Sequence, residues 1–375
     1  MSDIANMLTE TATRLFSELC TKAVLAAAET GNFPQALWVA VEEAGFASML
    51  AMEQDGGIAA SAPDAVTLLR VAGRFSAPVP LAETMIARWL LSQAGLSAGT
   101  GPLTIALGGM TADGWRLEGS GKNWTLHGKE HAVPWGSSAK SVVVVVGEGT
   151  GITLGVVDPT QLKTEARRNI AGEPRDELIA NVASVTKVAH LAGLDHDRVF
   201  RMAALFRAGL IVGALDSILE LSVRYVGERV QFGRPLARLQ AIQQQLAVLA
   251  GSVAASSAIT DAAACVIERE DGRLMIAAAR ARLADAIDTA TGIAHQVHGA
   301  MGFAREYALH LNTRRLWAWR DEYGTAVQWR ERLGRSFAGI AADDLWPALA
   351  LVGARTETGK PLTHETPSIA RATAV

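Results

Sequence analysis

The sequence predicts a mainly helical α+β chain in three parts, and three changes of pattern along its 375 residues carry that prediction. Residues 4–98 are rich in Ala and Leu at helical spacing, with glycines and prolines as interruptions. Around Gly101 the pattern changes to short β-branched runs, which are typical of strands. From about Leu191, apolar residues return at gaps of three and four, as on buried helix faces.

These changes set the expected domain boundaries, which are an N-terminal helical domain over 1–100, a central β-domain over 101–190, a C-terminal helical bundle over 191–345 and a tail over 346–375. The central domain should hold strands near 104–107, 115–118, 124–127, 141–146, 152–157 and 183–189, arranged as a small antiparallel barrel or sandwich. Glycines at 147, 149 and 151 follow a strand, as in a dinucleotide-binding loop. The third glycine is misplaced and the next element is a strand, so we expect a hairpin turn.

Composition narrows the classes of function. The chain is 49% hydrophobic and 19% charged with a net charge of −3, so it should build a large core and lacks the basic surface of a nucleic-acid-binding protein. Cys20 and Cys265 are too few for a disulfide framework, which favours a reducing compartment. The N-terminus lacks the basic and apolar regions of a secretory signal, and the longest apolar strand, 142–146, is too short to span a membrane. We expect a soluble cytoplasmic protein without membrane insertion.

The segment 225–240 joins two apolar-faced helices through a sharp break. Gly233 tolerates positive φ, and Pro235 cannot continue a helical hydrogen-bond ladder. Arg229 lies at the end of the first helix, where a planar guanidinium beside a turn suits a phosphate oxygen pair. Taken alone, the segment is better explained as an ordinary antiparallel helix hairpin that carries a solvated arginine.

A second motif decides between these interpretations. R-x-x-F-G-x-P-L-x-x-x-Q begins at Arg229, and Q-x-x-G-x-x-G-F-x-x-E begins at Gln296. The two together, in this order and at this separation, resemble the acyl-CoA dehydrogenase family, strongly over 195–325 and weakly before it. The resemblance implies the acyl-CoA dehydrogenase fold, with an N-terminal helical domain, a central small β-barrel domain and a C-terminal four-helix bundle.

The resemblance also implies α,β-dehydrogenation of an acyl-CoA thioester. A carboxylate base removes the α-proton, FAD accepts the hydride, and electrons pass to an electron-transferring flavoprotein. In the family each FAD spans two subunits, so a homologous subunit or a second copy is implied as a partner in a dimer or tetramer. The expected cofactor-binding residues, at the nucleotide end, are Arg229, Phe232, Gly233, Gln240, Gln296, Val297, His298, Gly299 and Ala300, where Ala300 replaces the family's second glycine.

The family's catalytic residues are not matched. The usual glutamate position, 27 residues after Gln296, holds Tyr323, and a phenol with a pKa of about 10 is a poor base at neutral pH. The other position used in the family, 26 residues before Arg229, holds Ala203. Glu322 is a secondary candidate, although one step along a helix turns a side chain by about 100°.

The segments that meet the flavin ring in the family have also changed. They correspond to 107–113 and 132–134, and Pro134 has no N–H to donate. We therefore expect a subunit of a heteromeric acyl-CoA dehydrogenase that completes the FAD site of a glutamate-bearing partner. Such heteromers occur in bacterial steroid side-chain degradation, which suggests a bulky acyl-CoA.

Two alternatives stay open. One is a self-sufficient homo-oligomeric dehydrogenase with a displaced base such as Glu322, and the other is a flavin-free scaffold of the same fold. A metal site is not expected, because no carboxylate or cysteine completes a ligand set with His295, His298 and His310.

Overall fold

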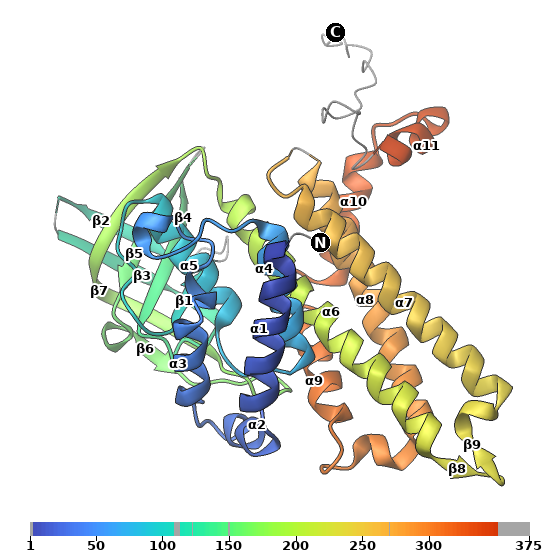
Figure 1. Cartoon of the computed structure of the whole chain (residues 1–375). Helices are drawn as coiled ribbons and strands as arrows, with labels where there is room; N and C mark the ends of the chain where they lie inside the picture. Colours follow the sequence, from blue (N-terminus) through green and yellow to red (C-terminus); the bar gives the residue numbers. More distant parts are fainter. Residues whose placement is uncertain (1–2, 109–112, 122, 149–150, 270, 352–375) are drawn as a thin grey trace.

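Helices at both ends of the chain flank a seven-stranded sheet, which confirms the predicted fold class (Figure 1). The computed structural model describes residues 3–108, 113–121, 123–148, 151–269 and 271–351. The expected tail lies outside the described residues from position 352 onward.

Within residues 3–108, the N-terminal region forms five α-helices and two short 3₁₀ helices. They are α1 Asp3–Leu19, α2 Lys22–Glu29, α3 Gln35–Glu43, η1 Phe46–Ser48, η2 Glu53–Asp55, α4 Ala62–Arg74 and α5 Leu81–Gln93. A capping box starts α4, because the Ser61 hydroxyl accepts from the Asp64 N–H while the Asp64 carboxylate accepts from the Ser61 N–H. Phe16 and Trp38 are fully buried on the inner faces of these helices.

The central region forms one mixed sheet. Its strands are β1 Leu103–Ala106, β2 Arg116–Ser120, β3 Asn123–Pro134, β4 Ser141–Glu148, β5 Gly151–Val157, β6 Lys163–Glu165 and β7 Arg175–Ala192, with the 3₁₀ helix η3 Pro159–Gln161 before β6. The strand order is β1-β4-β5-β7-β3-β2, and β6 pairs with β7. The expectation of a purely antiparallel sheet is wrong at one edge, where β1 runs parallel to β4, because β2 and β3 intervene in the sequence and give the chain room to return in the same direction.

β7 is longer than the sequence predicts. It runs for 18 residues and joins the two halves of the sheet, pairing with β5 through its second half and with β3 through its first. Its start, Arg175-Asp176-Glu177, has the charge pattern of a loop, but all three residues are buried. The expected hairpin between β4 and β5 is antiparallel up to the pair Glu148 and Gly151, and its residues 149–150 lie outside the described residues.

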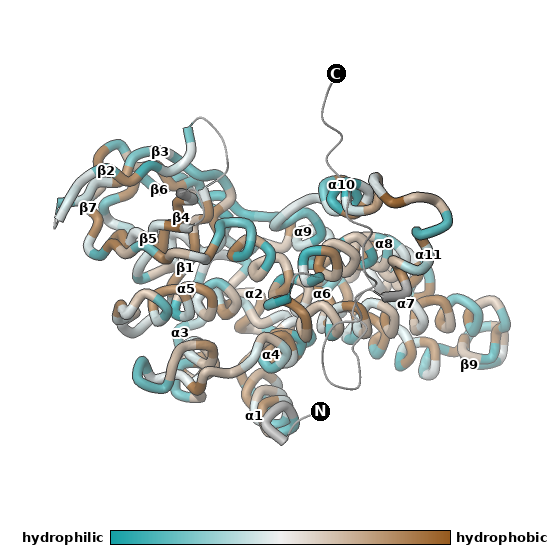
Figure 2. Tube along the Cα trace, turned by 90° about the horizontal axis from the view of Figure 1, so that it is seen from above, coloured by the Kyte–Doolittle hydropathy of each residue, from teal (hydrophilic) through white to brown (hydrophobic). Residues whose placement is uncertain are grey.

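The C-terminal region is built on long antiparallel helices. They are α6 His196–Glu228, α7 Gln240–Cys265, α8 Gly272–His298, α9 Leu309–Trp319, α10 Ala326–Phe337 and α11 Ala342–Leu351, with the two-residue strands β8 Val230–Gln231 and β9 Arg234–Pro235 and the 3₁₀ helices η4 Leu236–Arg238 and η5 Gly299–Phe303. α6 starts beside the sheet and ends at the β8–β9 ribbon, which forms the tip of the molecule opposite the sheet (Figures 1 and 2).

α4 packs against α6 at backbone distance. An added Cβ at Gly73 would lie 2.1 Å from the Leu210 carbonyl oxygen, and one at Gly213 would lie 1.8 Å from the Arg70 carbonyl oxygen. Glycine is required at these two positions because no side chain fits between the two backbones.

Among the described residues, two helices, α6 and α7, are long and apolar enough to cross a membrane by length and composition. The apolar window of α6 is 83% buried inside the protein. A buried core helix passes this test as readily as a membrane span does, so α6 gives no argument for membrane insertion.

Candidate functional site

The residues of the two sequence motifs that begin at Arg229 and Gln296 lie at the tip of the molecule, on and beside the β8–β9 ribbon. Arg229 ends α6, and the Leu236 N–H donates to its carbonyl oxygen at 2.9 Å, which closes the turn. Phe232 and Gly233 have φ of 54° and 76°, so both central residues of the two-residue turn are left-handed, as in a type I′ hairpin. The Phe232 side chain is 87% exposed. The sequence predicted the turn and missed the short ribbon around it.

The polar members of the motif face solvent. Arg229, Gln240 and Gln296 are all exposed, and the Arg229 guanidinium has no hydrogen bond or ion pair with another described residue. Gln240 starts α7 and Gln296 lies in the last turn of α8, so both are close to helix ends. One guanidinium and two amides are therefore available as donors to a ligand outside this chain's own core.

Val297 and His298 instead point into the protein. The His298 ring stacks on Tyr225 at a centroid distance of 4.5 Å, and its Nδ1–H donates to the Ala294 carbonyl oxygen at 2.7 Å. The Tyr307 hydroxyl lies 3.1 Å from His298 Nε2, and burial lowers the pKa of His298. The ring thus joins the last turn of α8 to the last turn of α6 and holds the two motifs side by side.

Gly299 and Ala300 follow as the start of η5. Gly299 has φ 57° and ψ −139°, a backbone conformation that only glycine adopts readily. Ala300 is exposed, so its extra methyl group does not disturb the packing of the turn.

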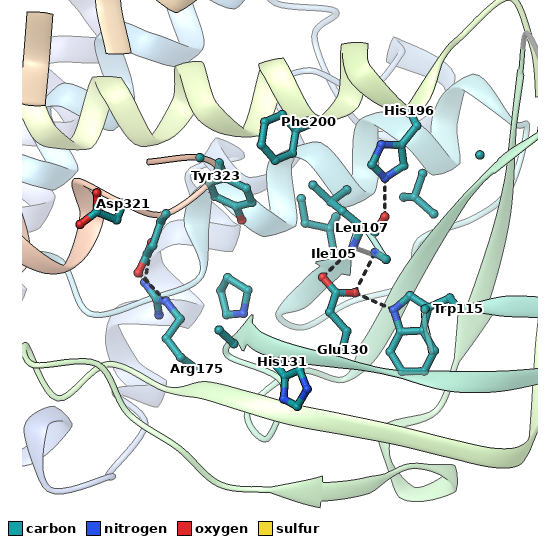
Figure 3. Close-up of a pocket in the computed structure, with 18 of the residues that line it drawn as sticks. Ile105, Leu107, Trp115, Glu130, His131, Arg175, His196, Phe200, Asp321 and Tyr323 are labelled. Atoms are coloured by element: carbon teal, nitrogen blue, oxygen red, sulfur yellow. Dashed lines mark hydrogen bonds and ion pairs between the residues drawn. The ribbon is translucent and has the colours of Figure 1, made fainter. Parts of the chain in front are cut away.

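A cleft of about 1220 Å³ opens at the other end of α6, between that helix, the sheet and the turn after α9 (Figure 3). Ile105 and Leu107 from the end of β1, and Ala132 and Pro134 from β3, form the sheet side. His196, Asp197 and Phe200 from the first turns of α6, with 321–324 from the turn, form the helical side. The two segments that the resemblance assigns to the flavin ring thus meet here as far as they are described; residues 109–112 lie outside the described part.

Tyr323 lies on the cleft wall with its hydroxyl directed into the cavity (Figure 3). Its φ is 54°, and its ring packs edge-on against Phe200 at 6.3 Å. Burial raises the pKa of Tyr323 above its ordinary value, with Glu83 adding to the effect. The phenol therefore stays protonated at neutral pH and is a hydrogen-bond donor rather than a base.

Glu322 also lines the cleft, but both of its oxygens are paired. Oε1 lies 2.7 Å from Arg175 Nε, and Oε2 lies 3.1 Å from Arg175 Nη2 and 2.9 Å from Arg207 Nε. Both oxygens of this carboxylate are therefore occupied by charge-assisted contacts to buried guanidiniums. The alternative position, Ala203, is buried in α6 away from the cleft lining.

These ion pairs continue into a buried network that sequence reasoning missed. Glu173 Oε2 accepts from Arg175 Nη2 at 3.0 Å and from Trp319 Nε1 at 2.8 Å, and Glu173 Oε1 lies 3.3 Å from Arg315 Nε. Burial alone would raise the pKa of Glu173, but Arg175 and Arg315 outweigh it and hold that pKa at about 2. A signal was present in the sequence, because Arg207 interrupts an otherwise apolar helical run and a buried arginine needs a partner.

Arg280 fixes the turn that carries Glu322 and Tyr323. It is 2% exposed, and its Nη2 donates to the carbonyl oxygens of Arg320 at 2.9 Å and Glu322 at 2.6 Å. Burial lowers its pKa to about 10, with the nearby Arg207 adding to the effect. Among the described residues no cluster of three or more His, Cys, Asp or Glu side chains could hold a metal ion.

Two family models match the chain on either side of the sheet. The model for the acyl-CoA dehydrogenase N-terminal domain matches residues 2–99, and the model for the acyl-CoA dehydrogenase C-terminal domain matches residues 196–326. Together they span well over half of the 375 residues.

Curated relatives and solved structures agree with these matches. "Acyl-CoA dehydrogenase IpdE2" of Mycolicibacterium smegmatis is 27% identical over 318 residues, which is 84% of this chain and 93% of that protein. The ChsE4-ChsE5 complex from Mycobacterium tuberculosis contains a chain with a TM-score of 0.83 at 22% identity, covering 91% of this chain and 99% of that one. A second structure, of a variant of the Tcur3481-Tcur3483 steroid ACAD, has a TM-score of 0.80 at 24% identity and covers 89% and 97% of the two chains.

Proposed function

The chain belongs to the acyl-CoA dehydrogenase family of oxidoreductases, which act on the CH–CH bond of acyl-CoA thioesters, and we propose that it is one subunit of a heteromeric enzyme. In that enzyme, this chain binds the nucleotide end of FAD. A homologous partner holds the flavin ring and the substrate and supplies the catalytic glutamate. This chain contributes Arg229, Gln240 and Gln296 to the nucleotide end of the partner's FAD.

The observation that carries the proposal is the distance between the two half-sites. α6 has 33 residues and therefore runs about 50 Å at about 1.5 Å per residue. The cleft lies at its first turns and Arg229 at its end. That span exceeds the length of a dinucleotide, which supports an FAD shared between the tip of one chain and the cleft of another. The residues of this chain's cleft then favour a heteromer over a homo-oligomer.

The residues at the tip fit the nucleotide part of FAD. A guanidinium and two amides donate to phosphate and to polar groups of adenine, and they are exposed where a partner can bring these groups. Exposed apolar side chains occur in the same motif segments, namely Val230 and Phe232 in the β8–β9 ribbon and Met301 and Phe303 in η5. Exposed apolar groups of this kind favour a subunit contact.

The residues of this chain's own cleft do not fit the flavin ring or the oxidation. When bound, FAD supplies the hydride acceptor. The cleft offers no unpaired carboxylate at the turn after α9, because Glu322 is held by two arginines and Tyr323 stays protonated. Pro134 has no N–H on the strand that would flank the ring.

The homo-oligomeric alternative rests on Glu322, since that carboxylate does line the cleft. To act as a base it would have to give up its ion pairs with Arg175 and Arg207, which would leave each of these buried guanidiniums with one carboxylate partner fewer. A chain that purified alone with full flavin and dehydrogenated an acyl-CoA would favour this alternative over the heteromer.

The partner's acyl substrate is a finer inference. Solved chains of similar fold come from the ChsE4-ChsE5 complex and a steroid ACAD, so we infer a bulky acyl-CoA for the complex and electron transfer to an electron-transferring flavoprotein.

The test is an Arg229→Ala substitution in the complex purified with a homologous partner that carries the glutamate. Loss of one charge-assisted contact to phosphate, worth about 1.5–3 kcal/mol, should weaken FAD binding by one to two orders of magnitude. The measurement is FAD retained after gel filtration at limiting flavin. Arg335→Ala is the matched control, because Arg335 is an exposed arginine on α10 whose ion pair is with Glu331 on the same helix. Unchanged FAD retention in the Arg229 variant would contradict the cross-interface role.

A further inference from the structure

The end of β3 carries a bulge that turns one carboxylate toward the end of β1. Glu130 pairs with Leu178 of β7 and Val133 pairs with Asp176, so two residues of β3 stand opposite one residue of β7. Ala132, inside the bulge, has a left-handed φ of 59°. Bulges of this kind re-aim neighbouring side chains. Here the carboxylate of Glu130 lies on the cleft wall (Figure 3).

Three N–H donors converge on this carboxylate. Glu130 Oε1 accepts from the Leu107 N–H at 3.2 Å, and Oε2 accepts from the Gly108 N–H at 2.9 Å and from Trp115 Nε1–H at 2.6 Å. Leu107 and Gly108 follow directly after β1, where no strand partner takes their N–H groups. Two backbone amides and one indole thus form a small oxygen-binding site.

Neighbouring groups hold the three donors in place. His196, the first residue of α6, hydrogen-bonds the Leu107 carbonyl oxygen through Nε2, which must carry the proton because a carbonyl only accepts. Trp115 is 5% exposed and belongs to the core of the β-domain. Burial raises the pKa of Glu130, against the opposing effect of the three donors. The site is therefore preorganised, and Glu130 is inserted into it at some desolvation cost.

We propose that the Leu107 and Gly108 amides and the Trp115 indole form a binding site for an acceptor oxygen of a ligand, a carboxylate or a carbonyl, and that Glu130 occupies this site as an internal substitute ligand. The cleft of this chain is thereby closed to oxygen-bearing ligands at its β1 end. The inference goes beyond the proposed function, because it needs neither a partner nor FAD.

The test removes the internal ligand and supplies it from solution. Glu130→Ala deletes the equivalent of one acetate ion, a methylene and a carboxylate. Acetate at pH 7 should therefore bind the variant and raise its melting temperature saturably. At ten times its dissociation constant, acetate raises the ratio of folded to unfolded chain about elevenfold. Sodium chloride at equal ionic strength should give no such rise, and neither should acetate with the wild-type chain.

Asp321→Ala is the matched control, because Asp321 lines the same cleft but its carboxylate accepts from the Arg320 side chain rather than from convergent N–H groups. Equal acetate stabilisation of the Glu130 and Asp321 variants, or none in the Glu130 variant, would overturn the proposal.

A second variant keeps the test decisive if Glu130→Ala does not fold. Glu130→Gln keeps the volume but sets an NH₂ group against one of the donors. Hydrogen exchange at Leu107 and Gly108 should then quicken at least tenfold relative to wild type, and acetate should not restore it because the amide still fills the site. Unchanged exchange at both amides would show that Glu130 does not hold them.

Discussion

Glu173 lies at the junction of β7 with α9, completely enclosed by groups that donate to it. Arg175, Arg315 and Trp319 all contact its carboxylate. The guanidiniums hold its pKa at about 2, well below the ordinary value of 4.5. A carboxylate with a depressed pKa contributes stability at pH values above its unfolded pKa and loses that contribution as pH falls toward its folded pKa.

Glu173→Gln should therefore destabilise the chain most at neutral pH. The change removes the carboxylate that pairs with the buried Arg315 and one of the two that pair with Arg175, which keeps Glu322. Breaking a buried ion pair in this way costs about 3–5 kcal/mol. Between about pH 4.5 and pH 2 the difference in unfolding free energy between wild type and variant should shrink by about 3 kcal/mol, because only wild type must protonate Glu173 to lose the interaction. Urea denaturation at a series of pH values measures both quantities.

Glu331→Gln is the control for this comparison, since Glu331 is an exposed carboxylate paired with Arg335 on the same helix. It should change the unfolding free energy by less than about 0.5 kcal/mol. A gap between wild type and Glu173→Gln that stays constant from pH 7 to pH 2 would contradict the account of the network.

Single residues divide clearly into those the sequence predicts and those it does not. Arg229, Gln240 and Gln296 sit in local motifs around turns, so their placement follows from neighbouring residues. Glu130 meets Leu107 from another strand, and Glu322 meets Arg175 across 147 positions. Such contacts depend on the register of β3 and on the path of the turn after α9, which no local pattern contains.

At the scale of elements, α6 is the helix that connects the cleft beside the sheet to the β8–β9 ribbon at the tip. The sequence places Arg229 at the end of a helix, and α6 ends at Glu228, with Arg229 as its C-cap. Asp195 caps the start of α6, where its carboxylate accepts from the Arg198 N–H at 2.6 Å. The bulge of β3 and the first half of β7 could not be predicted from the sequence. Charged residues usually favour loops, but buried ion pairs in this region override that preference.

Gly213→Ala should loosen the contact of α6 with α4. The new methyl group would fall 1.8 Å from the Arg70 carbonyl oxygen, so the two helices must separate. Overpacking of this kind costs about 1–3 kcal/mol, which outweighs the gain of about 1 kcal/mol that alanine brings to a helix interior. Thermal unfolding followed by circular dichroism measures the net loss.

Gly334→Ala should stabilise the chain, in contrast to Gly213→Ala. Gly334 lies in α10, and a Cβ there would meet no atom within 4 Å. The variant should gain up to about 1 kcal/mol from helix propensity alone. If the Gly213→Ala variant were as stable as the Gly334→Ala variant, this would contradict the close packing of α4 against α6.

At the scale of the whole molecule, the cleft lies at the first turns of α6 and Arg229 lies at the opposite end of that helix. A symmetric pair of identical chains would form two equivalent sites, each with a cleft of this kind. A heteromeric pair forms two different sites. In one, the partner's cleft meets the tip of this chain; in the other, this chain's cleft, with Glu130 and the paired Glu322, meets the tip of the partner.

The most direct test counts flavins in the purified complex of this chain with its glutamate-bearing partner. Native mass spectrometry combined with flavin absorbance gives the number of FAD molecules per pair of chains. The account predicts one FAD for each pair and little or none in this chain purified alone. Two FAD molecules for each pair, or a full complement in the isolated chain together with acyl-CoA oxidation, would contradict it.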